Sequence, residues 1–399
     1  MSNCHPKVLL YLKESIIKNH PKGGPYGVGA LYYNEQLKRN ENFFSFLKVR
    51  DTTPPKTLSN IFTNSHWLIM LKRRIRTLLF FINIPHAATR DFGEYDIVFF
   101  HQPSDLFREK DNLANFDGIV VLQSHCPEPE SHEICKNNGL DFGLIKKFCE
   151  RSDRFAFERA DYVVFPCQEA EEPYIKGWKY FPQFEERKRK QFRFIPTGIV
   201  PLLAKRESVT IRDELNIPNE SFVVCYVGRH NKIKGYDIIK NIASRYFANH
   251  DDTWFVIGGK EGPLRSLDHP RWIEIGWTND AASYISASDV FFLPNRETYY
   301  DLVMLEILSL GKIVIASRTG GNRFFEKEGV KGVFLYDSVD EAIELLQKVN
   351  DMSHESRLEL GDFNRRYFLD HCQVESMYDK CKNLMIDLWN NKLRNDGKV

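Results

Sequence analysis

The chain of 399 residues is long enough for two domains of ordinary size, each with its own core. Its hydrophobic content of 42% and charged content of 27% are typical of soluble globular proteins. The 55 basic and 54 acidic side chains almost cancel, which argues against a general nucleic-acid binder, so we expect no nucleic-acid partner. Since no stretch reaches about 18 uncharged apolar residues, we expect no helix that spans a membrane.

The cysteines are scattered along the chain, and no two of them form a C-x-x-C pair. Several lie in or beside apolar runs of strand length, which favours reduced, buried thiols in the cytoplasm over a disulfide framework or a zinc site. The chain also has no D-x-D triplet, no H-E-x-x-H motif and no Walker lysine, so we expect neither a metal ion nor another cofactor. The eight cysteines are Cys4, Cys126, Cys135, Cys149, Cys167, Cys225, Cys372 and Cys381.

The amino-terminal region is predicted to begin with a strand at Val8 to Leu12. Four glycines follow between Lys22 and Ala30, ahead of a helical pattern. Glycines before a helix let the backbone approach a ligand and turn its N–H groups toward negative charge. Tyr32 stands where G-x-G-x-x-G has its third glycine, so the dinucleotide interpretation is weak and an ordinary loop before a helix is the alternative.

A stretch from 67 to 82 alternates basic residues with Trp, Leu, Ile and Phe. On a helical wheel Lys72, Arg73 and Arg76 share one side, whereas Arg74 points away and apolar residues interrupt the basic side. Basic residues flanked in this way can lie at an anionic membrane interface. A helix packed on its own domain, with solvated arginines, explains the pattern about as well.

Two apolar strands are predicted at 96–101 and 118–125, and each ends in a histidine. A polar residue at the end of an apolar strand occupies the ligand-facing position of a doubly wound sheet. Both are candidates for a site, and His101 has the weaker case. The alternative for His125 is a buried, hydrogen-bonded histidine without a role in binding.

The first domain is predicted to close after a strand at Phe192 to Pro196, which leads into a turn at Thr197 to Pro201. We place the boundary between residues 202 and 203. The basic run from Arg187 to Arg193 just before this strand is interpreted as a solvated helix face, with docking of an anionic acceptor as the alternative.

The second domain, 203–375, is predicted to open with a strand at Phe222 to Val227 that ends at Gly228 and Arg229. Lys234 stands just before a helix expected from Tyr236. An arginine fork and a lysine ammonium at a helix start can converge on a diphosphate, and the adjacent glycines permit close approach. Considered alone, two basic residues in a loop are more often solvated than functional.

The stretch 288–321 is predicted to form a strand, a loop, a helix from Leu302 to Leu310 and a second strand. The loop 294–301 therefore lies at the carboxyl end of a parallel strand, where open α/β sheets bind ligands. Glu306 follows on the first turns of the helix, where its carboxylate can accept hydrogen bonds from vicinal hydroxyls. Further along, 376–399 carries an i, i+4 apolar stripe and forms a final helix.

These motifs together resemble the donor-binding segment of retaining family-4 glycosyltransferases of the GT-B fold. Gly228-Arg229, Lys234-Gly235 and the run from Pro294 to Glu306 carry the likeness. The resemblance implies an α/β protein with two Rossmann-like parallel-sheet domains that face each other across a cleft. In that scheme 1–202 binds the acceptor, 203–375 binds a nucleotide sugar, and the helix 376–399 crosses back to the first domain.

The resemblance also implies roles for individual residues. Arg229 and Lys234 would hold the diphosphate, Glu306 the ribose, and His125 would lie near the transferred sugar, so these four are the expected catalytic residues. Further donor contacts are expected from Gly24, Gly27, Gly228, Glu297, Thr298, Tyr300, Asp301, Leu302, Gly320 and Gly321.

Three positions depart from the family pattern. Thr298 stands in place of the first family glutamate, Asp301 in place of a glycine, and Phe324 in place of the glutamate after the glycine pair. The expected donor-sugar contacts of the loop are therefore less secure than the ribose contact.

The implied reaction is transfer of a sugar from a nucleotide-diphosphate donor to an acceptor hydroxyl with retention, without a metal. We expect the acceptor to be a saccharide or lipid-linked saccharide of cell-surface polysaccharide synthesis, and the enzyme to be cytoplasmic, with peripheral contact to an anionic membrane through 67–82. The alternatives are a non-catalytic GT-B accessory subunit and a GT-B nucleotide-sugar epimerase. An epimerase needs an acid and base pair of carboxylates, and none is in register.

Overall fold

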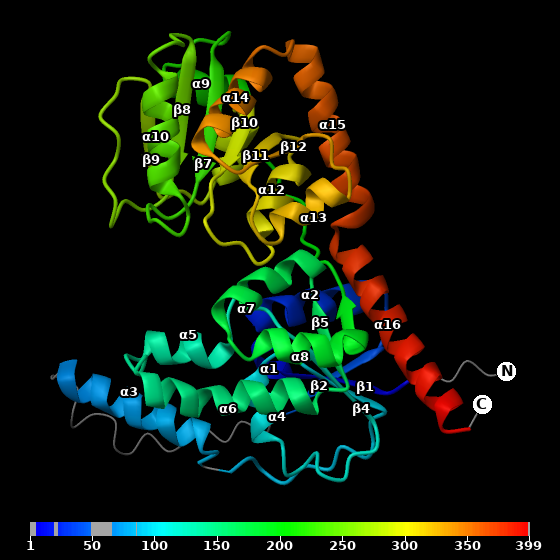
Figure 1. Cartoon of the computed structure of the whole chain (residues 1–399). Coiled ribbons are helices and arrows are strands. Elements are labelled where there is room, and N and C mark those ends of the chain that lie inside the picture. The colour runs from blue at the N-terminus through cyan, green and yellow to red at the C-terminus, as the bar shows by residue number, and fades with distance from the viewer. Residues whose placement is uncertain (1–4, 20–22, 49–65, 85, 398–399) are drawn as a thin grey trace. The chain divides into compact units, whose positions relative to one another are not determined.

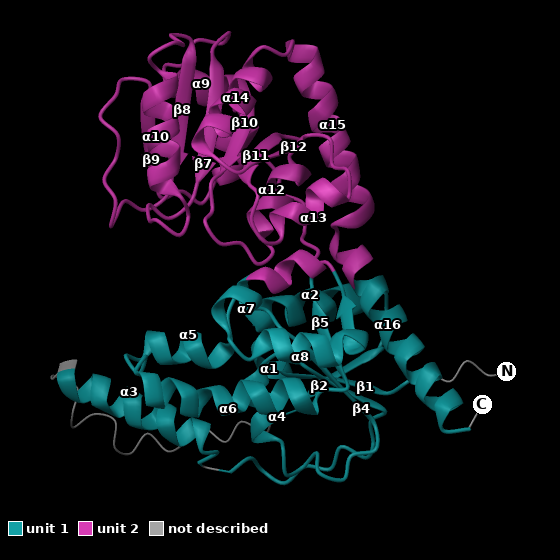
Figure 2. Ribbon diagram, viewed as in Figure 1, with its two compact units in different colours: residues 1–166, 173–195, 378–399 teal, residues 167–172, 196–377 magenta. Residues whose placement is uncertain are grey.

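The computed structural model describes residues 5–19, 23–48, 66–84 and 86–397. The chain divides into two compact units, shown in separate colours in Figure 2. Unit 1 comprises residues 1–166, 173–195 and 378–399, and unit 2 comprises residues 167–172 and 196–377. These divisions fall a few residues before 202 and just after 375, the boundaries placed from the sequence.

Unit 1 contains a six-stranded sheet with the order β2-β1-β3-β4-β5-β6, and every paired strand runs parallel. Its central strands are buried on both faces, as expected where helices cover both sides of a parallel sheet. This explains why their sequences are apolar at consecutive positions and do not alternate. The strands are β1 (Val8–Lys13), β2 (Phe44–Leu47), β3 (Ile97–Phe100), β4 (Ile119–Gln123), β5 (Tyr162–Phe165) and β6 (Phe192–Phe194).

The helices of unit 1 connect these strands and include the last helix of the chain (Figure 1). The helix α7 begins with Glu172, which belongs to unit 2, and α16 begins in unit 2 and continues into unit 1 from Tyr378. The helices are α1 (Glu14–Ile17), α2 (Gly24–Lys38), α3 (His66–Phe81), α4 (Pro103–Arg108), α5 (Glu130–Asn137), α6 (Gly143–Arg159), α7 (Glu172–Gly177), α8 (Phe181–Lys188) and α16 (Val374–Asn395), with a short 3-10 helix at Arg189–Gln191.

The glycine stretch near the amino terminus corrects one expectation. Gly24 and Gly27 were expected in a loop ahead of a helix, but both lie in the first turns of α2, and Gly23 precedes that helix with φ of 73°. Gly29, also in α2, packs so closely that an added Cβ would lie 2.5 Å from Leu12 Cδ1. Tight helix packing against β1 therefore explains at least one of these glycines.

Unit 2 contains a second six-stranded parallel sheet with the order β12-β11-β10-β7-β8-β9. Numbered within the unit from β7, this is the 3-2-1-4-5-6 order of Rossmann folds. The strands are β7 (Phe222–Val227), β8 (Thr253–Gly258), β9 (Trp272–Gly276), β10 (Val290–Leu293), β11 (Ile313–Ser317) and β12 (Val333–Tyr336).

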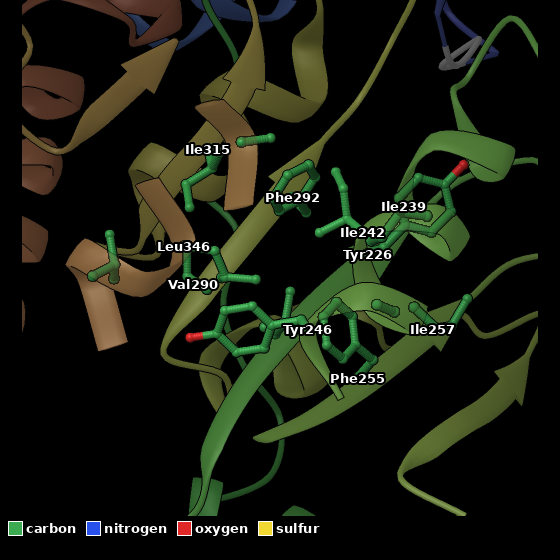
Figure 3. Packing of buried hydrophobic residues seen from close by; sticks show 14 of the residues in the cluster. Tyr226, Ile239, Ile242, Tyr246, Phe255, Ile257, Val290, Phe292, Ile315 and Leu346 are labelled. Atoms are coloured by element: carbon green, nitrogen blue, oxygen red, sulfur yellow. The ribbon is translucent and has the colours of Figure 1, made fainter. Parts of the chain in front are cut away.

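Side chains of these strands alternate between two cores, because successive residues of a strand point to opposite faces. One core joins Val224 and Phe292 to α10 and α14, and Figure 3 shows its packing. The other joins Phe291 and Leu293 to α12 and α15. The helices of unit 2 are α9 (Ser208–Glu214), α10 (Tyr236–Tyr246), α11 (Ala281–Ser286), α12 (Leu302–Ser309), α13 (Asn322–Lys327), α14 (Val339–Asn350) and α15 (His354–His371), with a 3-10 helix at Gln168–Glu171.

The described cysteines match the expectation of reduced thiols. All of them are unpaired, and only Cys126 is not fully buried, whereas Cys4 lies outside the described residues. No helix in the described part of the chain is both long and apolar enough to cross a membrane.

Candidate active site

The strand order of unit 2 places a ligand crevice between β7 and β10. The chain leaves β7 toward β8 on one side of the sheet and leaves β10 toward β11 on the other. Open α/β sheets bind ligands outside the carboxyl ends of the strands at such a switch point. The segments that follow these two strands are Gly228 to Gly235 and Pro294 to Asp301, which are the two motifs singled out from the sequence.

The loop after β7 is fixed by backbone contacts. Gly235 has φ of 66°, and a Cβ at this position would lie 1.8 Å from the carbonyl oxygen of Pro294. A side chain is therefore excluded both by the left-handed backbone and by the end of β10. Tyr226 Oη donates a hydrogen bond to Arg229 O at 3.0 Å, and Lys234 N donates to Asn231 Oδ1 at 2.9 Å. Arg229 and Lys234 thus lie on a loop that is fixed by packing and hydrogen bonds.

Arg229 and Lys234 differ in their surroundings. The Arg229 side chain is exposed, and no ion pair is found for it among the described residues. Lys234 Nζ lies 3.1 Å from Asp301 Oδ2, across the crevice from its own loop. The free guanidinium is available for an anion, whereas the ammonium already has a carboxylate beside it.

Asp301 begins α12 as its N-cap, because Oδ1 accepts a hydrogen bond from Val303 N at 3.1 Å. Its Oδ2 accepts a hydrogen bond from Asn295 Nδ2. Glu306 follows one turn later and is half-buried, and burial, together with the charge of Asp301, raises its pKa. No hydrogen bond or ion pair of the Glu306 carboxylate is found in the described chain, so its oxygens are open to a ligand hydroxyl.

The loop between β10 and α12 rests on the glycine pair after β11. A Cβ on Gly320 would lie 1.7 Å from Thr298 O, and one on Gly321 would lie 2.2 Å from Tyr299 O. Gly321 N donates to Thr298 O at 3.4 Å, and Gly320 N donates to Glu172 Oε2 at 3.2 Å. The N–H groups that the sequence offered to a ligand are thus engaged within unit 2, and the pair supports the loop.

Other predicted donor residues take different positions around this loop. Thr298 and Tyr300 are buried, and neither Thr298 Oγ1 nor Tyr300 Oη has a hydrogen-bond partner in the described chain. Glu297 and Leu302 are exposed, the first on the loop and the second at the start of α12. Gly228 ends β7 beside the Tyr226 ring. Unit 2 therefore gathers all the predicted donor residues except Gly24, Gly27 and His125, which belong to unit 1.

In unit 1 the two strand-end histidines form a pair. His101 Nδ1 lies 2.7 Å from His125 Nε2, and the rings stack with centroids 5.0 Å apart. Burial lowers the pKa of His125 to about 3, and burial together with the neighbouring imidazole lowers the pKa of His101 well below its ordinary value. Both rings are therefore neutral at physiological pH, so one ring donates its N–H and the other accepts.

The carboxylates of Glu130, which is half-buried, and Asp153, which is buried, serve the helices of unit 1. Glu130 accepts hydrogen bonds from Ser104 N, Ser104 Oγ and Gln102 Nε2, and so caps α4. Asp153 accepts from Glu130 N and Ser131 N at the start of α5. Burial raises the pKa of Asp153 to about 8. These contacts explain both groups as structural links between α4, α5 and α6.

Sequence reasoning gave His101 the weaker case and did not foresee the ion pair of Asp301. The strands β3 and β4 are adjacent and parallel, so the order of predicted strands could have indicated that their terminal histidines meet. No comparable signal marks Asp301, since its direction depends on the loop. Among the described residues there is no group of three or more His, Cys, Asp or Glu side chains suited to a metal ion.

The two Rossmann-like sheets define the protein as one with the fold of GT-B glycosyltransferases. Sucrose-phosphate synthase from Thermosynechococcus elongatus has a similar structure, with a TM-score of 0.61 at 17% identity, over 96% of this chain and 100% of that one. At this identity the likeness concerns the fold alone.

The sequence of unit 2 is similar to a known family. Residues 221–354 match the model of the glycosyl transferases group 1 family. The match includes Arg229, Lys234 and Glu306 and confirms the resemblance found in their motifs.

Two curated relatives are similar over part of the chain. A D-inositol 3-phosphate glycosyltransferase from Stackebrandtia nassauensis is 25% identical over 202 residues, which cover 44% of this chain and 45% of the relative. A UDP-Gal:alpha-D-GlcNAc-diphosphoundecaprenol alpha-1,3-galactosyltransferase from Escherichia coli is 29% identical over 191 residues, covering 45% of this chain and 49% of the relative. The chain thus spans about half the length of these relatives.

Proposed function

We propose that the protein is a glycosyltransferase that moves a sugar from a nucleoside-diphosphate donor to an acceptor hydroxyl with retention at the anomeric carbon. The observation that carries this proposal is the convergence of Arg229, Lys234 and Glu306 at the switch point of unit 2. Two cations suit the diphosphate, and the half-buried carboxylate of Glu306, for which no partner is found among the described residues, suits the ribose diol. The match of residues 221–354 to the glycosyl transferases group 1 family supports the same reaction class.

In the proposed reaction the bond between the anomeric carbon and the donor phosphate oxygen breaks, and a bond to the acceptor oxygen forms. The acceptor proton passes to the departing phosphate, and the nucleoside diphosphate leaves. The protein's contribution is fixed positive charge from Arg229 and Lys234 at the oxygens that gain charge, without a side-chain nucleophile and without a metal ion. His125 belongs to this proposal as an uncharged hydrogen-bonding group of unit 1.

The donor site is tested by binding across a panel of UDP-, GDP-, ADP- and dTDP-sugars. A donor that binds the site raises the free energy of unfolding by RT ln(1 + [L]/Kd), which is about 2.7 kcal/mol when the donor concentration is 100 Kd. The melting temperature rises accordingly. We expect one nucleotide to stabilise the wild type and to release its sugar slowly to water. Arg229→Ala should abolish the stabilisation, because it removes an exposed cation of the crevice for which no ion pair is found among the described residues.

Arg245→Ala is the matched control, since it removes an exposed arginine of the same unit that pairs with Asp340 away from the crevice. The control should respond to nucleotides as the wild type does. If no sugar nucleotide stabilises the wild type, the protein does not bind a donor by itself, and a non-catalytic accessory role replaces the proposed one.

We further propose that the acceptor is a lipid-linked saccharide, and that α3 binds the anionic membrane surface in which this acceptor lies. Four apolar residues of α3, Leu68, Leu71, Ile75 and Leu79, are between 36% and 50% exposed. Their spacing of three and four residues places them on one face, called here the α3 stripe. Lys72 and Arg76 are exposed along one edge of the stripe, and Arg73 is exposed further round the helix, so the helix offers apolar area beside positive charge.

The carboxyl-terminal part of α3 packs on its own unit. Phe81 is buried with Cys135, Leu140 and Cys149, and Leu78 and Phe80 pack against the same cluster. The helix is thereby held along α6, as Figure 1 shows, with its stripe uncovered by described residues. The E. coli relative is named for an acceptor on diphosphoundecaprenol, which agrees with a membrane-bound substrate.

The membrane proposal is tested by sedimentation with vesicles of phosphatidylglycerol and of phosphatidylcholine at low salt. The wild type should bind the anionic vesicles, and the double variant Leu71→Ser with Ile75→Ser should lose most of that binding. Leu358→Ser, at an exposed leucine of unit 2, is the control and should bind as the wild type does. Equal binding of all three proteins, or none by the wild type, contradicts the role of the α3 stripe.

A further inference from the structure

In the donor crevice the Asp301 carboxylate lies beside Lys234, where its negative charge opposes the binding of an anion. We propose that Asp301 is an internal counter-ion of Lys234. In the free protein Asp301 binds the ammonium group of Lys234, and this contact must break when the diphosphate binds, so Asp301 lowers the affinity for nucleoside diphosphates. This inference rests on the proposed function, because it concerns the same crevice.

The hydrogen bonds show which partner is fixed. Asp301 is only 10% exposed, and its two oxygens accept hydrogen bonds from Val303 N and Asn295 Nδ2 in addition to the contact with Lys234. Lys234 is 37% exposed and carries its charge on a flexible chain of four carbons. The lysine can therefore turn to a phosphate while the carboxylate stays in place.

The cost of this exchange is electrostatic. When Lys234 turns to a phosphate, the Asp301 carboxylate loses its cationic partner and remains close to a newly bound anion. Removing one partner from a poorly solvated ion pair leaves an uncompensated charge, and like charges at short range raise the free energy further. Glu306 also feels the charge of Asp301, so two carboxylates oppose an anion that binds beside Arg229 and Lys234.

The ion pair of Lys234 and Asp301 makes the crevice select between anions and also lowers its affinity for them. A simple anion must break the ion pair of Lys234 with Asp301, and it forms few new contacts apart from the one with Arg229. A nucleoside diphosphate also offers its ribose hydroxyls to Glu306, so it recovers the cost through a second contact. The crevice should accordingly reject pyrophosphate more strongly than it rejects a nucleoside diphosphate.

Asp301→Asn is the informative variant, because asparagine is isosteric and is as good an N-cap as aspartate, so α12 keeps its start. Asp301→Ser, which also caps a helix, serves as the second variant should the first fail to fold. Asp237→Asn is the matched control: Asp237 forms an ion pair of 2.7 Å with Arg296, a residue of the same loop as Asp301, and lies outside the predicted donor contacts.

The experiment is calorimetric titration of UDP, GDP, ADP, dTDP, the corresponding sugar nucleotides and pyrophosphate into the full chain, with circular dichroism to confirm folding. We expect Asp301→Asn to tighten binding of the preferred nucleoside diphosphate by roughly fivefold or more, the lower range of coupling between two sites. Pyrophosphate should gain by at least the same factor. Asp237→Asn should bind both ligands as the wild type does.

A double-mutant cycle with Lys234→Ala decides the cause of any gain. If Asp301 acts through Lys234, most of the Asp301→Asn gain disappears when the lysine is absent, and only the part due to like-charge repulsion stays. A gain of the same size without Lys234, or unchanged or weaker binding by Asp301→Asn alone, overturns the counter-ion role. Weaker binding confined to sugar nucleotides overturns it in favour of direct contact with the sugar.

Failure of the proposed function gives a different pattern. If the wild type binds a nucleoside diphosphate and Arg229→Ala does not, the donor site is supported, whether or not Asp301→Asn changes the affinity. If no variant binds any nucleotide, including Asp301→Asn, both the donor site and the counter-ion are rejected.

Discussion

The two units place very different side chains at equivalent positions of their sheets. In unit 2 the crevice beside β7 and β10 is charged, with Arg229, Lys234, Asp301 and Glu306 on backbone fixed by glycines. In unit 1 the strand β3, at the corresponding switch between β1 and β3, ends in His101, which pairs with His125. One unit presents ions to a ligand, and the other presents neutral imidazoles, of which His101 is buried and His125 half-buried.

The difference shows how each kind of site depends on its fold. Ions must keep access to water or to a ligand, because an isolated buried charge is costly, so they stand on loops and helix starts. Neutral imidazoles tolerate burial and depend on the strands and helices that enclose them. We therefore expect the crevice of unit 2 to be disrupted mainly by substitutions that alter its backbone, and the histidine pair of unit 1 to be disrupted mainly by protonation.

The largest expected effect is that of Gly235→Ala. The left-handed backbone alone costs an alanine about 1 to 2 kcal/mol, and the added Cβ would overlap Pro294 O at 1.8 Å. The free energy of unfolding of unit 2 should fall by about 3 kcal/mol or more, since a backbone group has to move. Urea unfolding followed by circular dichroism, together with loss of nucleotide binding, measures the effect.

Gly329→Ala separates the two causes. Gly329 has φ of 71° but nothing within 4 Å of an added Cβ. Only the cost of the left-handed backbone applies, so a loss of about 1 kcal/mol with unchanged nucleotide binding is expected. Equal losses in both variants would mean that contact with the end of β10 is unimportant.

A smaller effect is expected from acid on unit 1. The folded pKa of His125 is lowered to about 3, whereas in the unfolded chain the histidine titrates near its ordinary value of about 6.5. Between these values the unfolded state binds more protons, so the free energy of unfolding falls as the pH decreases. From pH 6.5 to pH 5 the loss for one such histidine is about 1.5 kcal/mol.

Urea unfolding of the wild type at several pH values from 7 to 5 measures this slope, with His125→Gln as the test. Glutamine cannot be protonated, so the variant should lose part of the dependence. His354→Gln, at an exposed histidine of α15, should keep the wild-type slope. The same slope in His125→Gln as in the wild type would contradict the burial of a neutral imidazole.

The smallest effect is expected where unit 1 holds α16 through surface ions. Lys382 Nζ lies 2.7 Å from Glu41 Oε2, and both side chains are partly exposed. Exposed pairs of this kind contribute about 0.2 to 1 kcal/mol and weaken with salt. Lys382→Ala should therefore shift the unfolding midpoint slightly at low salt and hardly at all at 1 M salt, and a large shift at high salt would contradict this account.

The charged crevice was the part that could be predicted from the sequence. Arg229, Lys234 and Glu306 lie in short motifs beside apolar runs, so local spacing is enough to place them at strand ends and helix starts. The parallel sheets and the likeness to group 1 glycosyl transferases were recognised for the same reason. The contact between Lys234 and Asp301 could not be predicted, because it joins side chains from two separate loops.

Local patterns failed where packing decided the structure. The glycines near residue 24 indicate a loop by their propensity, but α2 includes them because it packs closely on β1. The apolar stripe of α3 was masked on a helical wheel by residues such as Phe80, which the fold turns toward α5 and α6. In each case the missing information was which face of a helix its neighbours cover.

The path of the chain through the two units has a consequence for synthesis on the ribosome. Tyr378, on the last helix, packs its ring edge against Phe44 with centroids 5.7 Å apart and lies near Tyr32. Unit 1, although it is translated first, cannot close this core until residue 378 has emerged, whereas unit 2 has all of its residues by then. The amino-terminal half of the protein should therefore be the last to become resistant to proteases on a nascent chain.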